Sequence, residues 1–346
     1  MNGVPAVKLG YKASSEQFGP DELLGYGLMA ERYGFDSVFL SDHLQPWRHD
    51  GGHAPAVLPM LGALGARTER IVIGTSVLTP TFRYHPAVVA QAFATLGSLF
   101  PGRVVLGLGS GEAMNEAPLG IAWPNGKERL ARLREAVDLI RALWRDERVT
   151  FEGDYYRTVN ATIYDRPEKE VPIWLAASGP AATRFAGRTG DGWITTSGKD
   201  AALYTDVLLP AVATGAAAAG RAPERLEKMI EVKVSFDPDR DRALAATRFW
   251  AALGLGADQK AGIEDPVELQ RLADRLPLED AARRFIVSTD PDEHVQQIKS
   301  YVDLGFNHLV FHSPGPDQAQ FFELYGREIL PRLRDSFSPH GRSSWV

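Results

Sequence analysis

Short apolar runs and helical patterns alternate along most of this 346-residue chain. The apolar runs, rich in β-branched residues, predict buried strands, and the longer periodic stretches between them predict helices. Eight strands are predicted in this way, at residues 7–11, 37–40, 71–75, 103–109, 171–176, 192–196, 229–235 and 308–312. Strict alternation requires a parallel sheet, and eight strand–helix units favour closure into an α/β fold of the (β/α)8 TIM barrel type.

The same pattern predicts one domain. No linker rich in glycine or serine and no shift in composition divides residues 1–333, which we expect to form a single barrel. Residues 237–277 are longer than a simple connection and predict an inserted, mainly helical segment. We expect a polar excursion with a turn at Gly153-Asp154 before the fifth strand, and a polar C-terminal tail over residues 334–346.

Composition narrows the classes of function. The chain has 38 basic and 44 acidic residues, a formal net charge of −6, and no basic tract, which argues against nucleic acid as a partner. It has no cysteine, which excludes disulfides, thiolate metal sites and a cysteine nucleophile. Residues 1–10 lack the pattern of a secretory signal, and no apolar run approaches the ~18 residues of a membrane span. We therefore expect a soluble cytoplasmic protein with no membrane partner.

Candidate chemistry gathers after the second predicted strand. Asp42 and His43 follow it directly, and Trp47 comes four residues after the histidine. In a barrel the chemistry lies on the loops after the strands, and an imidazole is suited to acid–base work near pH 7. This stretch predicts a base in His43, oriented by Asp42, with Trp47 as an apolar wall. The alternative is an ordinary polar loop with one buried indole.

A glycine-rich stretch follows the fourth predicted strand. Residues 107–112 differ from the dinucleotide fingerprint G-x-G-x-x-G, because Glu112 occupies the place of the third glycine and we expect no helix to begin at once. The stretch instead indicates a backbone that a ligand approaches closely, with Glu112 delivered to the pocket. A glycine-rich turn that packs against a neighbouring strand is the alternative.

An acidic protein that binds an anion must gather its cations or other anion-binding groups locally. Three places in the sequence contain such groups. Residues 176–180 lead into a helix that starts at Pro180. This turn would either bind an anion at the helix N-terminus or serve only as a connection between strand and helix, and the sequence favours the two equally. Thr196–Lys199 offers two hydroxyls, free amides and an ammonium. Lys260 and Arg284, in or just after the insertion, would add charge if that segment folds over the pocket. Taken singly, each is more typical of a solvated surface.

Two other kinds of site are unlikely on the sequence pattern. His49 and His53 are separated by a Gly-Gly pair with no glutamate in the H-E-x-x-H arrangement, so we expect no metal. No serine stands in a G-x-S-x-G elbow, which argues against a hydrolase triad.

Seven stretches together resemble the deazaflavin-dependent glucose-6-phosphate dehydrogenases, a family of the luciferase-like barrel superfamily, over nearly the whole chain to about Leu333. These are Leu9–Ala13, Ser41–Arg48, Gly51–Pro55, Gly74–Tyr84, Gly111-Glu112, Thr196–Lys199 and Asn307–His312. The resemblance implies a luciferase-like barrel that uses coenzyme F420, oxidises glucose 6-phosphate, and forms a homodimer. It also implies a non-proline cis peptide at Ser76–Val77, beneath the deazaflavin ring.

The resemblance further implies roles for individual residues. The catalytic set would be His43, Trp47 and Glu112, with Glu112 protonated and directed at N1 of the deazaflavin. Cofactor contacts would come from Asp42, Ser76, Val77, Ser110, Gly111, Asn115, Ala177, Ser178 and Gly179. The sugar phosphate would be held by Thr196, Lys199, Lys260 and Arg284. Two positions depart from the family pattern: Ser178 replaces a frequent glycine, and Ser110 a usual threonine.

Three alternatives remain open at this stage. They are a sister F420-dependent alcohol or sugar-phosphate dehydrogenase, an FMN-dependent monooxygenase of the luciferase type, and a binding protein without catalysis. The cations distinguish the first, since Lys199, Lys260 and Arg284 would have no purpose with an uncharged alcohol.

Overall fold

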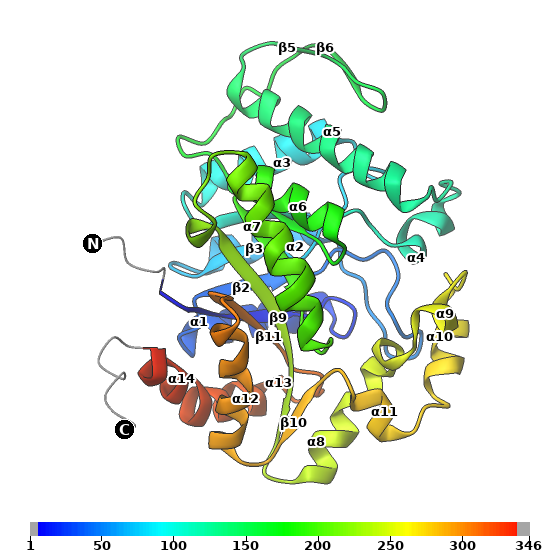
Figure 1. Cartoon of the computed structure of the whole chain (residues 1–346), viewed down its shortest axis with the longest axis vertical. Helices are drawn as coiled ribbons and strands as arrows, with labels where there is room; N and C mark the ends of the chain where they lie inside the picture. Colours follow the sequence, from blue (N-terminus) through cyan, green and yellow to red (C-terminus); the bar gives the residue numbers. More distant parts are fainter. Residues whose placement is uncertain (1–5, 338–346) are drawn as a thin grey trace.

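A computed structural model describes residues 6–337 as a closed barrel of parallel strands surrounded by helices (Figure 1). Within this range eight strands pair in the order β1-β2-β3-β4-β7-β8-β9-β11, and β11 pairs back with β1. They are β1 Lys8–Ala13, β2 Ser37–Leu40, β3 Val72–Thr75, β4 Val104–Leu108, β7 Ile173–Ala176, β8 Gly192–Thr196, β9 Glu227–Phe236 and β11 His308–His312. The predicted (β/α)8 barrel is confirmed, and each predicted strand overlaps an observed one.

Helices cover the outside of the barrel. They are α1 Pro20–Arg32, α2 Val57–Arg67, α3 Pro86–Leu99, α4 Ala113–Glu116, α5 Gly126–Arg145, α6 Pro180–Thr189, α7 Leu209–Ala218, α12 Pro291–Asp303, α13 Gln318–Leu324 and α14 Leu330–Phe337. Local chemistry sets their starts: the Asn125 side chain accepts bonds from two amides at the start of α5, and Asp290 does the same for α12. Among the described residues, no helix is long and apolar enough to cross a membrane.

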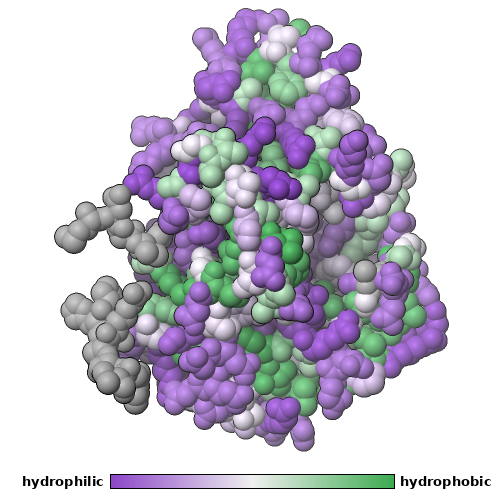
Figure 2. Space-filling model, viewed as in Figure 1, coloured by the Kyte–Doolittle hydropathy of each residue, from purple (hydrophilic) through white to green (hydrophobic). Residues whose placement is uncertain are grey.

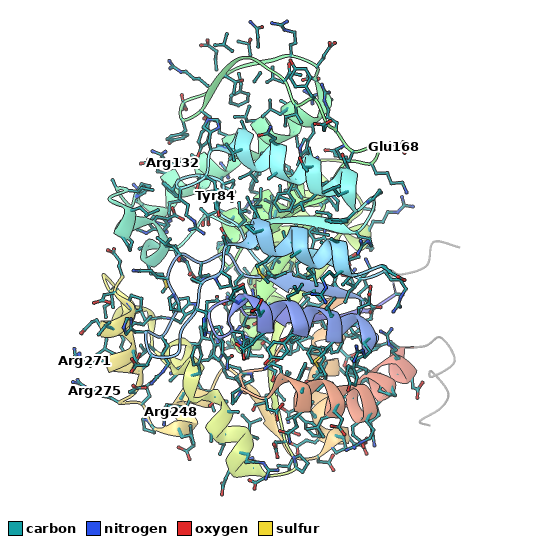
Figure 3. All side chains as sticks on the ribbon, turned by 180° about the vertical axis from the view of Figure 1, so that it is seen from behind. Tyr84, Arg132, Glu168, Arg248, Arg271 and Arg275 are labelled. Carbon is teal, nitrogen blue, oxygen red and sulfur yellow. The ribbon has the colours of Figure 1, made fainter. Side chains whose placement is uncertain are left out.

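A helical insertion lies beside the mouth of the barrel (yellow in Figure 1). It contains α8 Arg240–Ala246, η4 Thr247–Gly254, α9 Ala257–Lys260, α10 Pro266–Ala273 and α11 Leu278–Ala282. Its small apolar core includes Leu255 and Leu269, and it also takes in Met114 and Trp47 from the barrel loops. Arg48 forms an ion pair of 2.6 Å with Asp274. These contacts fix the insertion against the loop that follows β2. Arg248, Arg271 and Arg275 mark this region in Figure 3.

The polar excursion predicted between the fourth and fifth barrel strands contains secondary structure that was not predicted. Residues 149–161, expected to be a polar excursion, form an antiparallel hairpin of β5 Val149–Glu152 and β6 Arg157–Ala161, with the turn at Gly153-Asp154. The strands are short and mostly exposed, so the buried alternation that predicts a strand is absent. The Glu135 carboxylate of α5 accepts bonds from the backbone N–H groups of residues 154–156 and holds the turn. A short strand, β10 Ile286–Ser288, also extends the sheet beside β9.

The C-terminal tail predicted for residues 334–346 falls mostly outside the described residues. Residues 334–337 continue helix α14.

The interior of the barrel changes character along its axis. Near the middle of the strands the inward side chains form an apolar cluster: Phe39, Val105, Trp174, Ile194, Met229 and Val310. Because alternate residues of a strand share a face, the next inward position on β9 is Glu231, and on β11 it is His312. The lumen is therefore packed below and polar at the carboxyl ends of the strands.

The outer surface in Figure 2 shows hydrophilic residues around its outline and apolar ones gathered in the middle.

Candidate active site

A pocket of about 670 Å³ opens at the carboxyl ends of the strands. Every site residue predicted from the sequence except Lys199 lines it, although these residues come from five different strand ends and from positions in or just after the insertion. The ammonium of Lys199 lies just behind the wall and donates to the Ser178 hydroxyl at 3.0 Å. Trp250 and Leu253 of the insertion complete the lining. The fold therefore brings the predicted residues together in one cavity.

His43 is held between two carboxyl groups and an amide. Its Nε2 lies 3.2 Å from Oε1 of Glu16 and 3.6 Å from Oε2 of Glu112. Its Nδ1 lies 3.1 Å from the Gln45 carbonyl oxygen and 3.3 Å from the Asn115 side-chain nitrogen. The Asn115 amide oxygen in turn accepts from the backbone amide of Leu44. The ring is thus fixed in orientation, with Nε2 at the pocket.

The prediction that Asp42 orients His43 is wrong. Asp42 instead forms an ion pair of 2.6 Å with Arg83, and the Tyr84 hydroxyl, labelled in Figure 3, lies 3.4 Å from its other oxygen. Arg83 also pairs with Glu116 at 2.6 Å. In residues 6–337 no hydrogen bond or ion pair joins Asp42 to His43. Neighbouring residues of an extended segment project to opposite sides, so Asp42 turns toward the loop before α3. Burial still raises the pKa of Asp42, although Arg83 opposes the rise.

Glu16 takes the place that the sequence analysis gave to Asp42. Its side chain is buried, and the Ser41 hydroxyl donates to its Oε2 at 2.5 Å. Burial by itself raises the pKa of the carboxyl, but the nearby charges of His43 and Lys12, with the bond from Ser41, hold it below its ordinary value. Glu16 is therefore an ionised partner for the imidazole.

Glu112 shows the opposite shift. Although 47% of its side chain faces the open pocket, the surrounding protein raises the pKa of its carboxyl. His43 opposes this rise, and the charge of Glu16 adds to it. Two carboxyl groups beside one imidazole cannot both ionise at low cost, so their pKa values move apart. Glu112 is the group on which a proton is more easily held.

The glycine-rich stretch serves both purposes that were considered for it. A Cβ at Gly107 would meet the Thr75 carbonyl oxygen at 1.8 Å, and one at Gly109 would meet Val77 at 2.6 Å, so the chain packs tightly on the end of β3. Gly109 and Gly111 also line the pocket. The expectation that no helix begins at once was wrong, because α4 begins at Ala113. The predicted cis peptide at Ser76–Val77 is confirmed.

The pocket also has a basic region, which includes Arg284 and extends to Lys260 beside Trp47. Arg284 donates to the Ser197 carbonyl oxygen at 3.1 Å, and Lys260 lies 5.6 Å from the centre of the Trp47 ring. Burial, with Arg284 and Lys233 nearby, lowers the pKa of Lys199 to about 8, and burial and Arg284 lower that of Lys260. None of these three cations forms an ion pair within the part of the chain that the structure describes. An anionic ligand would relieve this mutual repulsion.

A third part of the wall is the start of α6. Gly179 precedes the helix without a side-chain cap, and a Cβ added there would meet nothing within 4 Å. The first amides of α6 are therefore open, as an anion at a helix N-terminus requires. Ser110 and Asn115 of the pocket lining add a hydroxyl and an amide. No group of three or more His, Cys, Asp or Glu residues able to hold a metal is found in residues 6–337.

Five functional candidates were not identified from the sequence: Lys12, Glu16, Arg83, Glu231 and Lys233. Lys12 lies near the carboxyl end of β1 and Glu16 follows that strand, so the rule that barrel chemistry lies at strand ends would have included them. Arg83 had no such signal, since only the fold brings it to Asp42 and Glu116.

Known proteins are similar to this chain over most of its length. The family model described as "Luciferase-like monooxygenase" matches residues 6–308. An F420-dependent glucose-6-phosphate dehydrogenase of Nakamurella multipartita is 67% identical over 330 residues, which are 95% of this chain and 97% of that protein. One from Microbacterium testaceum is 66% identical over 96% of this chain and 99% of its own.

Solved structures are similar as well. An F420-dependent secondary alcohol dehydrogenase in complex with an F420-acetone adduct matches with a TM-score of 0.90 and 35% identity, covering 96% of this chain and all of that one. A coenzyme F420-dependent tetrahydromethanopterin reductase from Methanopyrus kandleri shares the fold, with a TM-score of 0.80 at 22% identity over 95% of this chain and 100% of its own.

Proposed function

We propose that this protein oxidises C1 of glucose 6-phosphate with coenzyme F420 as hydride acceptor. The chain belongs to the luciferase-like family and, within it, to the F420-dependent glucose-6-phosphate dehydrogenases. The products are 6-phosphogluconolactone and reduced F420. The observation that carries the proposal is the division of one pocket into an imidazole–carboxyl end and a basic end without acidic partners. A hexose phosphate fits both, because its C1 hydroxyl can meet the imidazole and its phosphate can meet the cations.

The residues present fit the cofactor. The open, uncapped helix start at Gly179 would hold its phosphate, and the apolar side chains of Val77, Ala176 and Ile194 would contact its ring system. We assign Asp42, Ser110, Gly111 and Asn115, together with the Ser76–Val77 and Ala177–Gly179 segments, to this cofactor site. When bound, F420 supplies a hydride acceptor at C5 of its deazaflavin ring.

The proton that leaves the sugar goes to His43. Loss of hydride from C1 requires loss of the C1 hydroxyl proton, and Nε2 of His43 is the ring nitrogen that faces the pocket. Glu16, 3.2 Å from that nitrogen, stabilises the imidazolium that forms. General base catalysis of this kind contributes roughly 10²- to 10⁴-fold to rate. Trp47 lies beside the base, with ring centres 6.0 Å apart, and excludes water from the reacting carbon.

Glu112 supplies the second proton. The surrounding protein raises the pKa of its carboxyl, which favours the protonated form, and this carboxyl would donate to a ring nitrogen of the bound deazaflavin. We assign Thr196, Lys199, Lys260 and Arg284 to the phosphate of the substrate. These remote contacts fix the position of C1 relative to His43, and such positioning lowers a barrier without taking part in the chemistry.

The similarity to an alcohol dehydrogenase favours one alternative, a sister enzyme for uncharged alcohols. The basic end argues against it. Three cations with no acidic partner in residues 6–337 would destabilise a pocket built for a neutral ligand.

The test is an absorbance assay. Purified protein with oxidised F420 should lose the visible deazaflavin absorbance when glucose 6-phosphate is added, and unphosphorylated glucose or 2-propanol should give little loss. Bleaching with 2-propanol and not with the sugar phosphate would identify the sister enzyme. Copurified FMN with oxygen-dependent turnover would identify a monooxygenase.

A further inference from the structure

Four buried side chains form the floor of the pocket, and the proposed mechanism leaves them without a role. Lys12 comes from β1, Glu231 and Lys233 from β9, and His312 from β11, and each is less than a tenth exposed. All four line the pocket. They stand on three neighbouring strands, because β11 pairs with both β1 and β9 and places His312 opposite Lys233. We call these four residues the floor cluster.

The floor cluster carries both donors and an acceptor. Glu231 lies 3.0 Å from the ammonium of Lys233 through Oε1, and 3.7 Å from that of Lys12 through Oε2. The charges of Lys233 and Lys12, with the nearby His312 ring, hold the pKa of Glu231 well below its ordinary value, although burial opposes this. A carboxylate and two ammonium groups at the bottom of an open pocket are costly to desolvate unless polar ligand groups meet them.

His312 is the member of the floor cluster whose polar atoms have the fewest hydrogen-bond partners. Neither of its ring nitrogens makes a well-directed hydrogen bond to any described residue, and the contact of Nδ1 to Glu231 Oε1 is 3.4 Å. The ring is only 2% exposed and packs edge-on against Trp250, with ring centres 4.4 Å apart. Buried polar groups in native proteins nearly always have a partner. A polar group of a ligand in the pocket would be within reach as a hydrogen-bond partner for the His312 ring nitrogens.

The floor cluster lies between the two ends of the pocket. On one side, the Ser197 hydroxyl accepts from the backbone amide of Lys233 at 2.9 Å, and the Ser197 carbonyl oxygen accepts from Arg284. On the other side, the charge of Lys12 acts on both Glu16 and Glu112. A hexose 6-phosphate with C1 at His43 and its phosphate at Arg284 would present the hydroxyls of C2, C3 and C4 between these ends.

We propose that the floor cluster is the subsite that binds the ring hydroxyls of the hexose phosphate and selects among its epimers. The inference rests on the proposed function and adds to it the part of the site that recognises sugar configuration. Each sugar hydroxyl both donates and accepts, so it is matched by the Glu231 carboxylate together with a Lys233 or His312 donor. Hydrogen bonds to charged partners are about twice as strong as neutral ones, which makes such a subsite selective.

The test compares substrates that lack single hydroxyls. His312→Phe keeps an aromatic ring against Trp250 and removes both nitrogens, whereas His312→Gln keeps a donor and an acceptor. Steady-state kcat/KM is measured for glucose 6-phosphate, its 2-, 3- and 4-deoxy analogues, and mannose 6-phosphate. We expect His312→Phe to lose roughly tenfold to hundredfold on glucose 6-phosphate. The analogue that already lacks the hydroxyl bound by His312 should lose almost nothing, and His312→Gln should recover part of the activity.

The outcomes are separable. Equal losses on all five substrates would mean that His312 only supports the fold, and unchanged kinetics would mean that it meets no hydroxyl; either overturns the inference. F420 affinity, followed by fluorescence, reports whether each variant is intact, and Lys233→Met, tested on the same panel, replaces a variant that does not fold. A wild-type protein that fails to oxidise glucose 6-phosphate would instead refute the proposed function.

Discussion

The two ends of the pocket handle charge in opposite ways. At the His43 end the charged groups have protein partners: Asp42 pairs with Arg83, and Glu16 contacts both His43 and Ser41. At the basic end, none of Lys199, Lys260 and Arg284 has an acidic ion-pair partner in the described range of the chain. The first end is complete within the protein, whereas the second needs a ligand to complete it.

This difference assigns different work to the two ends. Groups held by protein contacts keep their geometry before the substrate arrives, which is the condition for acid–base chemistry at a fixed atom. Cations that repel one another gain most when an anion binds, so we expect them to supply binding energy and selection. Substitutions at the first end should therefore change kcat, and those at the second end KM.

The largest expected effect is at the protein-satisfied end. His43→Ala removes the proposed base and should lower kcat roughly 10²- to 10⁴-fold. Affinity for F420, measured by fluorescence, should stay nearly unchanged, because the assigned cofactor contacts remain. His49→Ala is the matched control, since His49 is an exposed histidine on the same loop. Turnover in His43→Ala close to that of His49→Ala would show that another group takes the proton.

The same contrast explains what the sequence predicted. The barrel was predictable because its strands are continuous buried apolar runs, whereas the exposed β5–β6 hairpin carries no such run. Residues at the strand ends were predictable because a barrel gathers them at one mouth. The partner of His43 was not, because Glu16 lies on another loop and side-chain direction is decided only in the fold. The cations were easier to place, since their role depends on proximity and little on orientation.

A smaller effect is expected at the ligand-dependent end. Arg284→Met removes one phosphate contact and should raise KM for glucose 6-phosphate roughly tenfold to hundredfold, as loss of a charge-assisted bond does, with kcat reduced much less. Arg283→Met is the control, because Arg283 is the exposed neighbour with the same charge. Steady-state kinetics with unphosphorylated glucose complete the comparison. A similar loss on glucose would place Arg284 in the chemistry and remove the distinction between the two ends.

The smallest expected effect is a dependence on pH at the basic end. Burial beside Arg284 and Lys233 lowers the pKa of Lys199 to about 8, so its ammonium is charged below that pH and neutral above it in the free enzyme. The substrate phosphate, with a second pKa near ~6, is a dianion throughout this range. KM should therefore rise as pH increases from 7 to 9, by up to about tenfold, since one charge is then lost from the site. Lys199→Arg keeps its charge in this range and should flatten the curve. A flat curve in the wild type, or an equal slope in Lys199→Arg, would mean that Lys199 holds its proton in the pocket, and the basic end would then owe its affinity to Lys260 and Arg284.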